Sequence, residues 1–107
     1  MVAVQKIFLL GAVYKIENLK TKTGNDMCTF TLRTWRKAGK DKPDKVNFFR
    51  CVSYSGAAEV LGKYLFDKKV VYIEGTPDLY KDKDGNERFQ VIVNEFSFIG
   101  DKQEESA

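Results

Sequence analysis

Residues 46–66 read Val-Asn-Phe-Phe-Arg-Cys-Val-Ser-Tyr-Ser-Gly-Ala-Ala-Glu-Val-Leu-Gly-Lys-Tyr-Leu-Phe, and the periodicity of this stretch changes halfway. Up to Tyr54 the side chains alternate, which is the period-2 pattern of a β-strand. One face of this expected strand carries Phe48, Arg50, Val52 and Tyr54, and the other carries Phe49, Cys51 and Ser53. The stretch therefore predicts a strand that passes directly into a helix.

The expected helix runs from Gly56 to Phe66, with Ser55 as its N-cap and Glu59 in its first turn. Its apolar positions recur at helical spacing. They are Ala57, Val60, Leu61, Tyr64 and Leu65. This is the one segment of the chain whose pattern favours a helix.

Besides the strand at 46–54, further strands are expected on both sides of this unit, at 4–14, 27–36, 70–75 and 88–99. Asp84-Gly85 is a hairpin-turn signal between the last two strands. Gly11 and Gly75 indicate a bulge or sharp bend where a small barrel closes. Three strands, one helix and two more strands predict an all-β protein, a five-stranded OB-fold Greek-key barrel with one helix between strands 3 and 4.

Length and composition narrow the class of protein. The 107 residues suffice for one domain, expected over 1–100, followed by a short polar C-terminal tail over 101–107. The chain has no histidine, and its two cysteines, Cys28 and Cys51, are expected to be buried thiols in a reducing compartment. We therefore expect a cytoplasmic protein with no metal, no cofactor and no membrane segment.

Charge is distributed unevenly along the chain. Residues 1–50 carry eleven Lys or Arg and four Asp or Glu, whereas residues 51–107 carry seven and eleven. This polarity is typical of a domain that turns a basic face to an anion, nucleic acid being the commonest large one. Lysine-rich loops that only keep the protein soluble would give the same count.

The second and third strands carry aromatic side chains where a core does not need them. Cys28, Phe30 and Leu32 already fill the inner face of residues 27–36. The opposite faces of the two strands still hold Trp35, Phe48 and Tyr54, interleaved with Arg33 and Arg50, and Tyr80 would extend the row along the last hairpin. Rings beside guanidinium groups suit single-stranded nucleic acid, because bases stack on the rings while cations meet phosphates.

The expected base-stacking residues are thus Trp35, Phe48, Tyr54 and Tyr80, and the expected phosphate contacts are Arg33, Arg36, Lys37, Arg50, Lys81 and Arg88. Two structural alternatives stay open. Trp35 or Tyr80 would pack at a strand edge, or the strand of Phe48 and Phe49 would be buried on both faces.

Several short motifs, in order, resemble the bacterial single-stranded DNA-binding protein (SSB) family. Phe48-Phe49-Arg50-Cys51-Val52-Ser53-Tyr54-Ser55-Gly56-Ala57-Ala58-Glu59-Val60 is similar to its third strand and helix start. Val71-Tyr72-Ile73-Glu74-Gly75 and the hairpin Asp82–Phe89 match further stretches of the family. The family's stacking aromatics fall on Trp35, Phe48, Tyr54 and Tyr80, and its strand-three arginine falls on Arg50.

The resemblance implies sequence-independent binding and protection of single-stranded DNA in replication, recombination and repair. It also implies a homo-oligomer, tetramer or dimer, that contacts replication and repair proteins. The last residues, 100–107, lack the Pro-Phe tip of cellular members, which suggests a short phage or plasmid member, a truncated chain, or a PriB-like primosomal replication-restart adaptor that binds single-stranded DNA and a helicase.

Two other classes of function remain alternatives. An OB-fold nuclease would need clustered carboxylates for a metal, but the acidic residues lie mostly in hairpin turns beside lysines, so we expect no enzyme. A module that binds only proteins would leave the aromatic face without a nucleic acid ligand.

Overall fold

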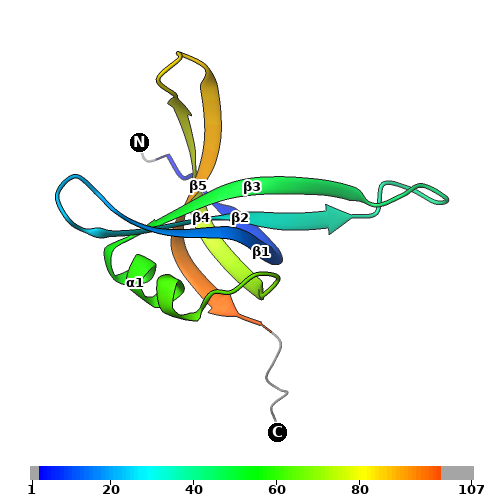
Figure 1. Ribbon diagram of the computed structural model, residues 1–107. Coiled ribbons are helices and arrows are strands. Elements are labelled where there is room, and N and C mark those ends of the chain that lie inside the picture. The colour runs from blue at the N-terminus through cyan, green and yellow to red at the C-terminus, as the bar shows by residue number, and fades with distance from the viewer. Residues whose placement is uncertain (1–2, 100–107) are drawn as a thin grey trace, which may run out of the picture.

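The computed structural model describes residues 3–99, which form five strands and one helix (Figure 1). The elements are β1 (Ile7–Lys20), β2 (Asp26–Arg36), β3 (Lys45–Tyr54), α1 (Ser55–Tyr64), β4 (Val70–Lys81) and β5 (Glu87–Phe98). The expected tail, 101–107, lies outside the described residues. Within residues 3–99 no helix is long and apolar enough to cross a membrane.

The strands close into a barrel in the order β1-β2-β3-β5-β4. All neighbours are antiparallel except β3 and β5, which pair in parallel at Cys51–Val91 and Val52–Ile92. The first half of β1 pairs with β4, and its second half pairs with β2. This topology, with α1 between β3 and β4, confirms the predicted five-stranded OB-fold.

The core of the barrel is the inner face that alternation predicted. Cys28, Phe30 and Leu32 of β2 are at most 2% exposed, and Cys51 of β3 is fully buried. Val13, Leu61, Val71, Ile73 and Val91 complete the cluster. Both cysteines are free and buried, as predicted, and burial raises the pKa of the Cys51 thiol to about 12.

The two glycines predicted to mark barrel closure do so. A Cβ on Gly11 would collide with the backbone oxygen of Arg33, and a Cβ on Gly75 would collide with the backbone oxygen of Ile92. Gly11 lies where β1 exchanges β4 for β2, and the β4–β5 register shifts between Glu74 and Gly75. Close backbone approach thus fixes both closing points of the barrel.

The helix differs from the prediction in its start and in its buried face. α1 begins at Ser55, which has φ 56°, and Tyr54 occupies the N-cap position without a side-chain cap bond. Its first turn contains no acidic residue, so the roles predicted for Ser55 and Glu59 are wrong. Ala58 and Leu61 are buried, whereas Val60 and Tyr64 are 39% and 57% exposed. This short helix, which packs across the barrel, buries fewer of its apolar residues than the sequence pattern predicted.

Two strands are longer than predicted and build hairpin arms. β1 continues to Lys20, and β4 continues through Pro77 to Lys81. Pro77 is tolerated because β4 pairs with β1 only as far as Gly75. At Pro77 its one neighbour is β5, so β4 has an edge without a partner strand there. The β1–β2, β2–β3 and β4–β5 hairpins project from the barrel in three directions (Figure 1).

Replacing Gly11 with alanine tests the closure. We expect Gly11→Ala to lower the free energy of unfolding by about 1–3 kcal/mol, because the new methyl group meets backbone that moves little. Gly56→Ala is the control, since a Cβ there meets no described atom within 4 Å. Urea unfolding measures both variants, and equal stability of the two would contradict the proposed closing contact.

Candidate nucleic-acid interface

The outer face of β2 and β3 brings together four of the ten predicted site residues, Trp35, Phe48, Arg33 and Arg50. In the antiparallel register Arg33 lies opposite Phe48, Thr31 lies opposite Arg50, and Trp35 lies opposite Val46. Residues directly opposite each other share a face of the sheet. Rings and guanidinium groups from two strands therefore alternate on one surface.

The rings on this surface are uncovered. Phe48 is 65% exposed and Trp35 is 51% exposed. The Arg33 guanidinium carbon lies 5.2 Å from the centroid of the Trp35 ring, within cation–π range. Within the single chain, neither the helix nor any other described element buries the Phe48 face of β3, although its neighbour Phe49 packs against the core.

Tyr54 is exposed but stands apart from Phe48. Val52, which shares their face, is 1% exposed, and its cross-strand partner Thr29 is 2% exposed. Tyr54 lies six positions along β3 from Phe48, about 20 Å at the usual rise per residue. The structure therefore places Tyr54, 41% exposed, away from Phe48 and beyond a buried row of residues.

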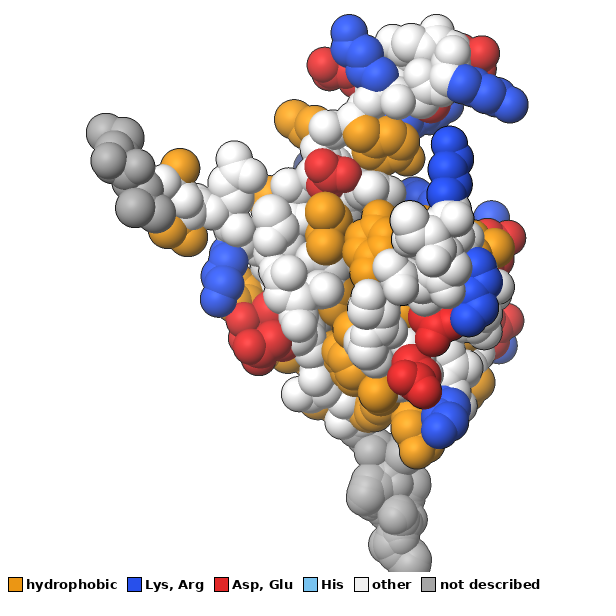
Figure 2. Space-filling view, turned by 90° about the vertical axis from the view of Figure 1, so that its left-hand side faces the viewer, with side chains coloured by type: hydrophobic (Ala, Val, Ile, Leu, Met, Phe, Trp, Pro, Cys, Tyr) orange, Lys and Arg blue, Asp and Glu red, His pale blue; other side chains and the backbone are white. Residues whose placement is uncertain are grey.

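Tyr80 and Arg88 lie opposite each other on the β4–β5 arm. The Arg88 Nε donates to Asp82 Oδ2 at 2.9 Å, and Asp82 Oδ1 accepts the backbone N–H groups of Asp84 and Asn86. The bond from Arg88, with those from the backbone, lowers the pKa of the Asp82 carboxyl. The ion pair partly offsets the charge of Arg88, and the arm tip shows both blue and red side chains at the top of Figure 2.

Arg50 connects this arm to the β2–β3 face. Its Nε donates to Gln90 Oε1 at 3.4 Å, and Gln90 Nε2 donates to Asp78 Oδ2 at 2.9 Å. The Arg50 side chain is exposed. The network holds its guanidinium beside β5, between the Phe48 surface and the arm.

The remaining predicted cations lie towards the ends of the arms. Arg36 is the last residue of β2, opposite Lys45, and Lys37 follows it in the loop. Lys81 ends β4. All are exposed, so the β2–β3 arm presents a cationic end to solvent. Among residues 3–99 no group of three or more His, Cys, Asp or Glu residues is placed to hold a metal ion.

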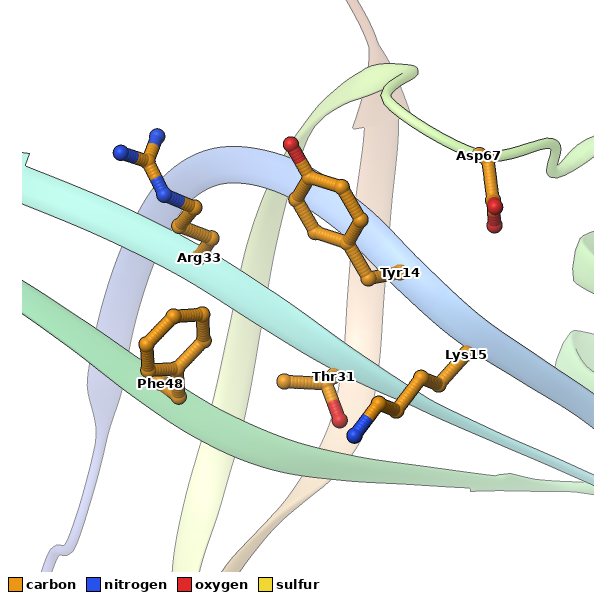
Figure 3. Close-up of a pocket in the computed structure, with 6 residues that line it drawn as sticks. All are labelled: Tyr14, Lys15, Thr31, Arg33, Phe48 and Asp67. Atoms are coloured by element: carbon orange, nitrogen blue, oxygen red, sulfur yellow. The ribbon is translucent and has the colours of Figure 1, made fainter.

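Sequence reasoning missed an open cavity of about 710 Å³ on the same face (Figure 3). Its lining residues are Tyr14, Lys15, Thr31, Arg33, Phe48 and Asp67. The β1–β2 register shifts between Tyr14 and Glu17, where Lys15 has φ 55°. Nothing in the sequence marks this bulge, because lysine is uncommon at positive φ. Tyr14 was the last residue of the predicted strand.

Comparison with known proteins gives one consistent family. Residues 4–99 match the single-strand binding protein family. The chain is 27% identical over 112 aligned positions to the single-stranded DNA-binding protein of Neisseria meningitidis, covering 97% of this chain and 64% of that protein. The single-stranded DNA-binding protein of Clostridium tetani is 30% identical over 106 positions, covering 92% of this chain and 73% of that one.

The protein of the same name from Treponema pallidum is 35% identical over 78 positions, which cover 70% of this chain and 44% of that protein. The chain thus spans between 44% and 73% of the length of these relatives.

The exposed position of Phe48 predicts a stability result. We expect Phe48→Thr to change the free energy of unfolding by no more than about 0.5 kcal/mol, since the ring buries little surface and threonine is also favoured in strands. Phe30→Ala is the control, because Phe30 is 2% exposed and its loss should cost about 3–5 kcal/mol. Chemical denaturation that gave Phe48→Thr a core-like cost would assign the ring a structural role.

Proposed function

The chain belongs to the single-strand binding protein family, and we propose that it binds single-stranded DNA without regard to sequence. Family membership also agrees with the expectation of a chain that is not an enzyme. The observation that carries the proposal is the uncovered ring of Phe48 directly opposite Arg33. A fully exposed strand face that only met water would not favour such a ring.

Bases stack on Phe48 and Trp35 at the β2–β3 face, on Tyr54 beyond the buried row, and on Tyr80 along the β4–β5 arm. Every base has a π-face, so this mode of binding tolerates any sequence. Phosphates meet Arg33 and the other cations proposed above for this role: Arg36, Lys37, Arg50, Lys81 and Arg88. The Arg88–Asp82 ion pair makes Arg88 the weakest of these contacts.

The protein acts in DNA replication, recombination and repair inside the cell, with replication and repair proteins as partners. Each relative described above is named a single-stranded DNA-binding protein, which favours this role over that of a restart adaptor.

A second copy of the chain covers the outer face of β1 and β4. Phe8 and Leu10 are 57% and 56% exposed there, opposite Glu74 and Tyr72. Two large apolar side chains on one strand mark a contact surface. Assembly as a dimer or tetramer would raise the affinity for a long strand, because each further domain binds at high effective concentration.

Titration with a fluorescent oligo-dT tests DNA binding. Since single strands give a slope of about −0.7 per phosphate contact, five contacts predict a slope of log affinity against log salt near −3.5. Phe48→Ala should weaken binding about tenfold or more. Trp35 is the one tryptophan of the chain, so stacking on it should also quench the intrinsic fluorescence.

A duplex of the same length is the control ligand. Equal affinity for duplex and oligo-dT, or an affinity that does not change with salt, contradicts the proposal.

Replacing Leu10 with arginine tests the assembly. We expect Leu10→Arg to lower the mass measured by sedimentation to that of the single chain, because it places a charge within the apolar contact. Leu79→Arg is the matched control, since Leu79 is 73% exposed on the β4–β5 arm. A wild-type protein that sediments as a 12.2 kDa monomer would rule out the proposed interface.

A further inference from the structure

Three neighbouring strands, β1, β2 and β3, line the open cavity on the outer face: β1 and β3 form its sides and β2 forms its floor. Tyr14 of β1 and Phe48 of β3 lie on either side of β2 (Figure 3). Thr31 lies opposite Tyr14, and Arg33 lies opposite Phe48, so both β2 residues occupy the floor between the rings. The cavity is hollow because the short Thr31 side chain stands between larger neighbours.

The volume of about 710 Å³ falls within the range of roughly 300–1,000 Å³ typical of sites for small ligands.

A backbone bulge brings a cation to this cavity. Lys15 has φ 55°, the left-handed region that non-glycine residues rarely adopt, and it lies where the β1–β2 register shifts. A regular strand would place Tyr14 and Lys15 on opposite faces of the sheet. The bulge instead lets both line the cavity. Lysine keeps a cation at this position, although glycine would adopt the same backbone conformation without strain.

The charges around the cavity are not symmetrical. Lys15 and Arg33 supply cations, and Asp67, from the segment between α1 and β4, supplies a carboxylate. A phosphate is attracted to the first two and repelled by the third. The cavity therefore offers rings on which a base can stack and cations that attract a phosphate, while the Asp67 carboxylate repels a phosphate from its own side. This arrangement suits one nucleotide bound in one orientation.

We propose that this cavity is a nucleotide subsite, in which one base of the bound strand stacks against Tyr14 and Phe48 while its phosphate contacts Lys15 and Arg33. The subsite rests on the proposed function, and it adds Tyr14 and Lys15 to the residues that contact DNA. It also continues the Trp35–Phe48 surface across β2 to β1.

Lys15→Gly tests the subsite, because glycine accepts the left-handed backbone while removing the cation. We expect an unfolding midpoint in urea that is unchanged or higher, and a salt slope for oligo-dT that is about 0.7 shallower. Lys68→Gly is the matched control. Lys68 also has positive φ, 74°, and also loses a charge, but it does not line the cavity. The control should keep the wild-type slope.

Tyr14→Leu tests the stacking contact with a side chain that stays apolar. We expect its affinity for oligo-dT to fall roughly fivefold or more. The control is Tyr64→Leu, because Tyr64 is an exposed ring on α1 that packs on Phe98 and should leave binding unchanged. If Tyr14→Leu does not fold, the slope of Lys15→Gly decides the question.

The outcomes separate the subsite from the proposed function. A wild-type protein that does not bind oligo-dT overturns the proposed function and the subsite with it. In another outcome the wild-type protein binds oligo-dT and Phe48→Ala weakens this binding, but Tyr14→Leu or Lys15→Gly behaves like its control. This outcome overturns the subsite and leaves the proposed function intact. A shallower salt slope in Lys15→Gly together with a lower affinity in Tyr14→Leu, with both controls unchanged, establishes the subsite.

Discussion

Closure of the barrel at Gly11 is the constraint on which the rest of the structure depends. β1 must pair with β4 over its first half and with β2 over its second, and the change of partner needs β1 backbone directly against the carbonyl of Arg33. That contact leaves no room for a side chain at position 11. It also fixes the backbone of β2 beneath Arg33, and so the position of the cation opposite Phe48. The closing point of the fold and the centre of the candidate site are therefore the same place.

Alternation predicted the site only as far as the strands stay regular. It placed Phe48 and Trp35 outside and Phe30 inside correctly, because a pleated strand turns successive side chains to opposite faces. It failed where tertiary packing covers an outward position, as at Val52. It gave no prediction for Lys15, which lies just beyond the predicted strand at a bulge that no glycine in the sequence indicates.

The helix shows the same limit. Spacing alone predicted a broad apolar face, but a ten-residue helix that packs across the barrel buries only Ala58 and Leu61. Val60 and Tyr64 belong to the predicted apolar face but are exposed in the structure, although Tyr64 makes a ring contact with Phe98. Which apolar residues of a short helix are buried depends on the surface beneath it, and a sequence pattern does not contain that surface.

The exposed rings of the candidate site are separate from one another. The Thr29–Val52 row divides Phe48 from Tyr54, and the β4–β5 arm leaves the barrel in another direction from the β2–β3 arm. A rigid duplex cannot follow such a path, because it bends only at considerable cost. A single strand can, since its bases unstack one at a time onto separate rings. In the proposed mode of binding, the separation of the rings disfavours duplex DNA without any contact that reads a base, and this preference would arise from the shape of the barrel.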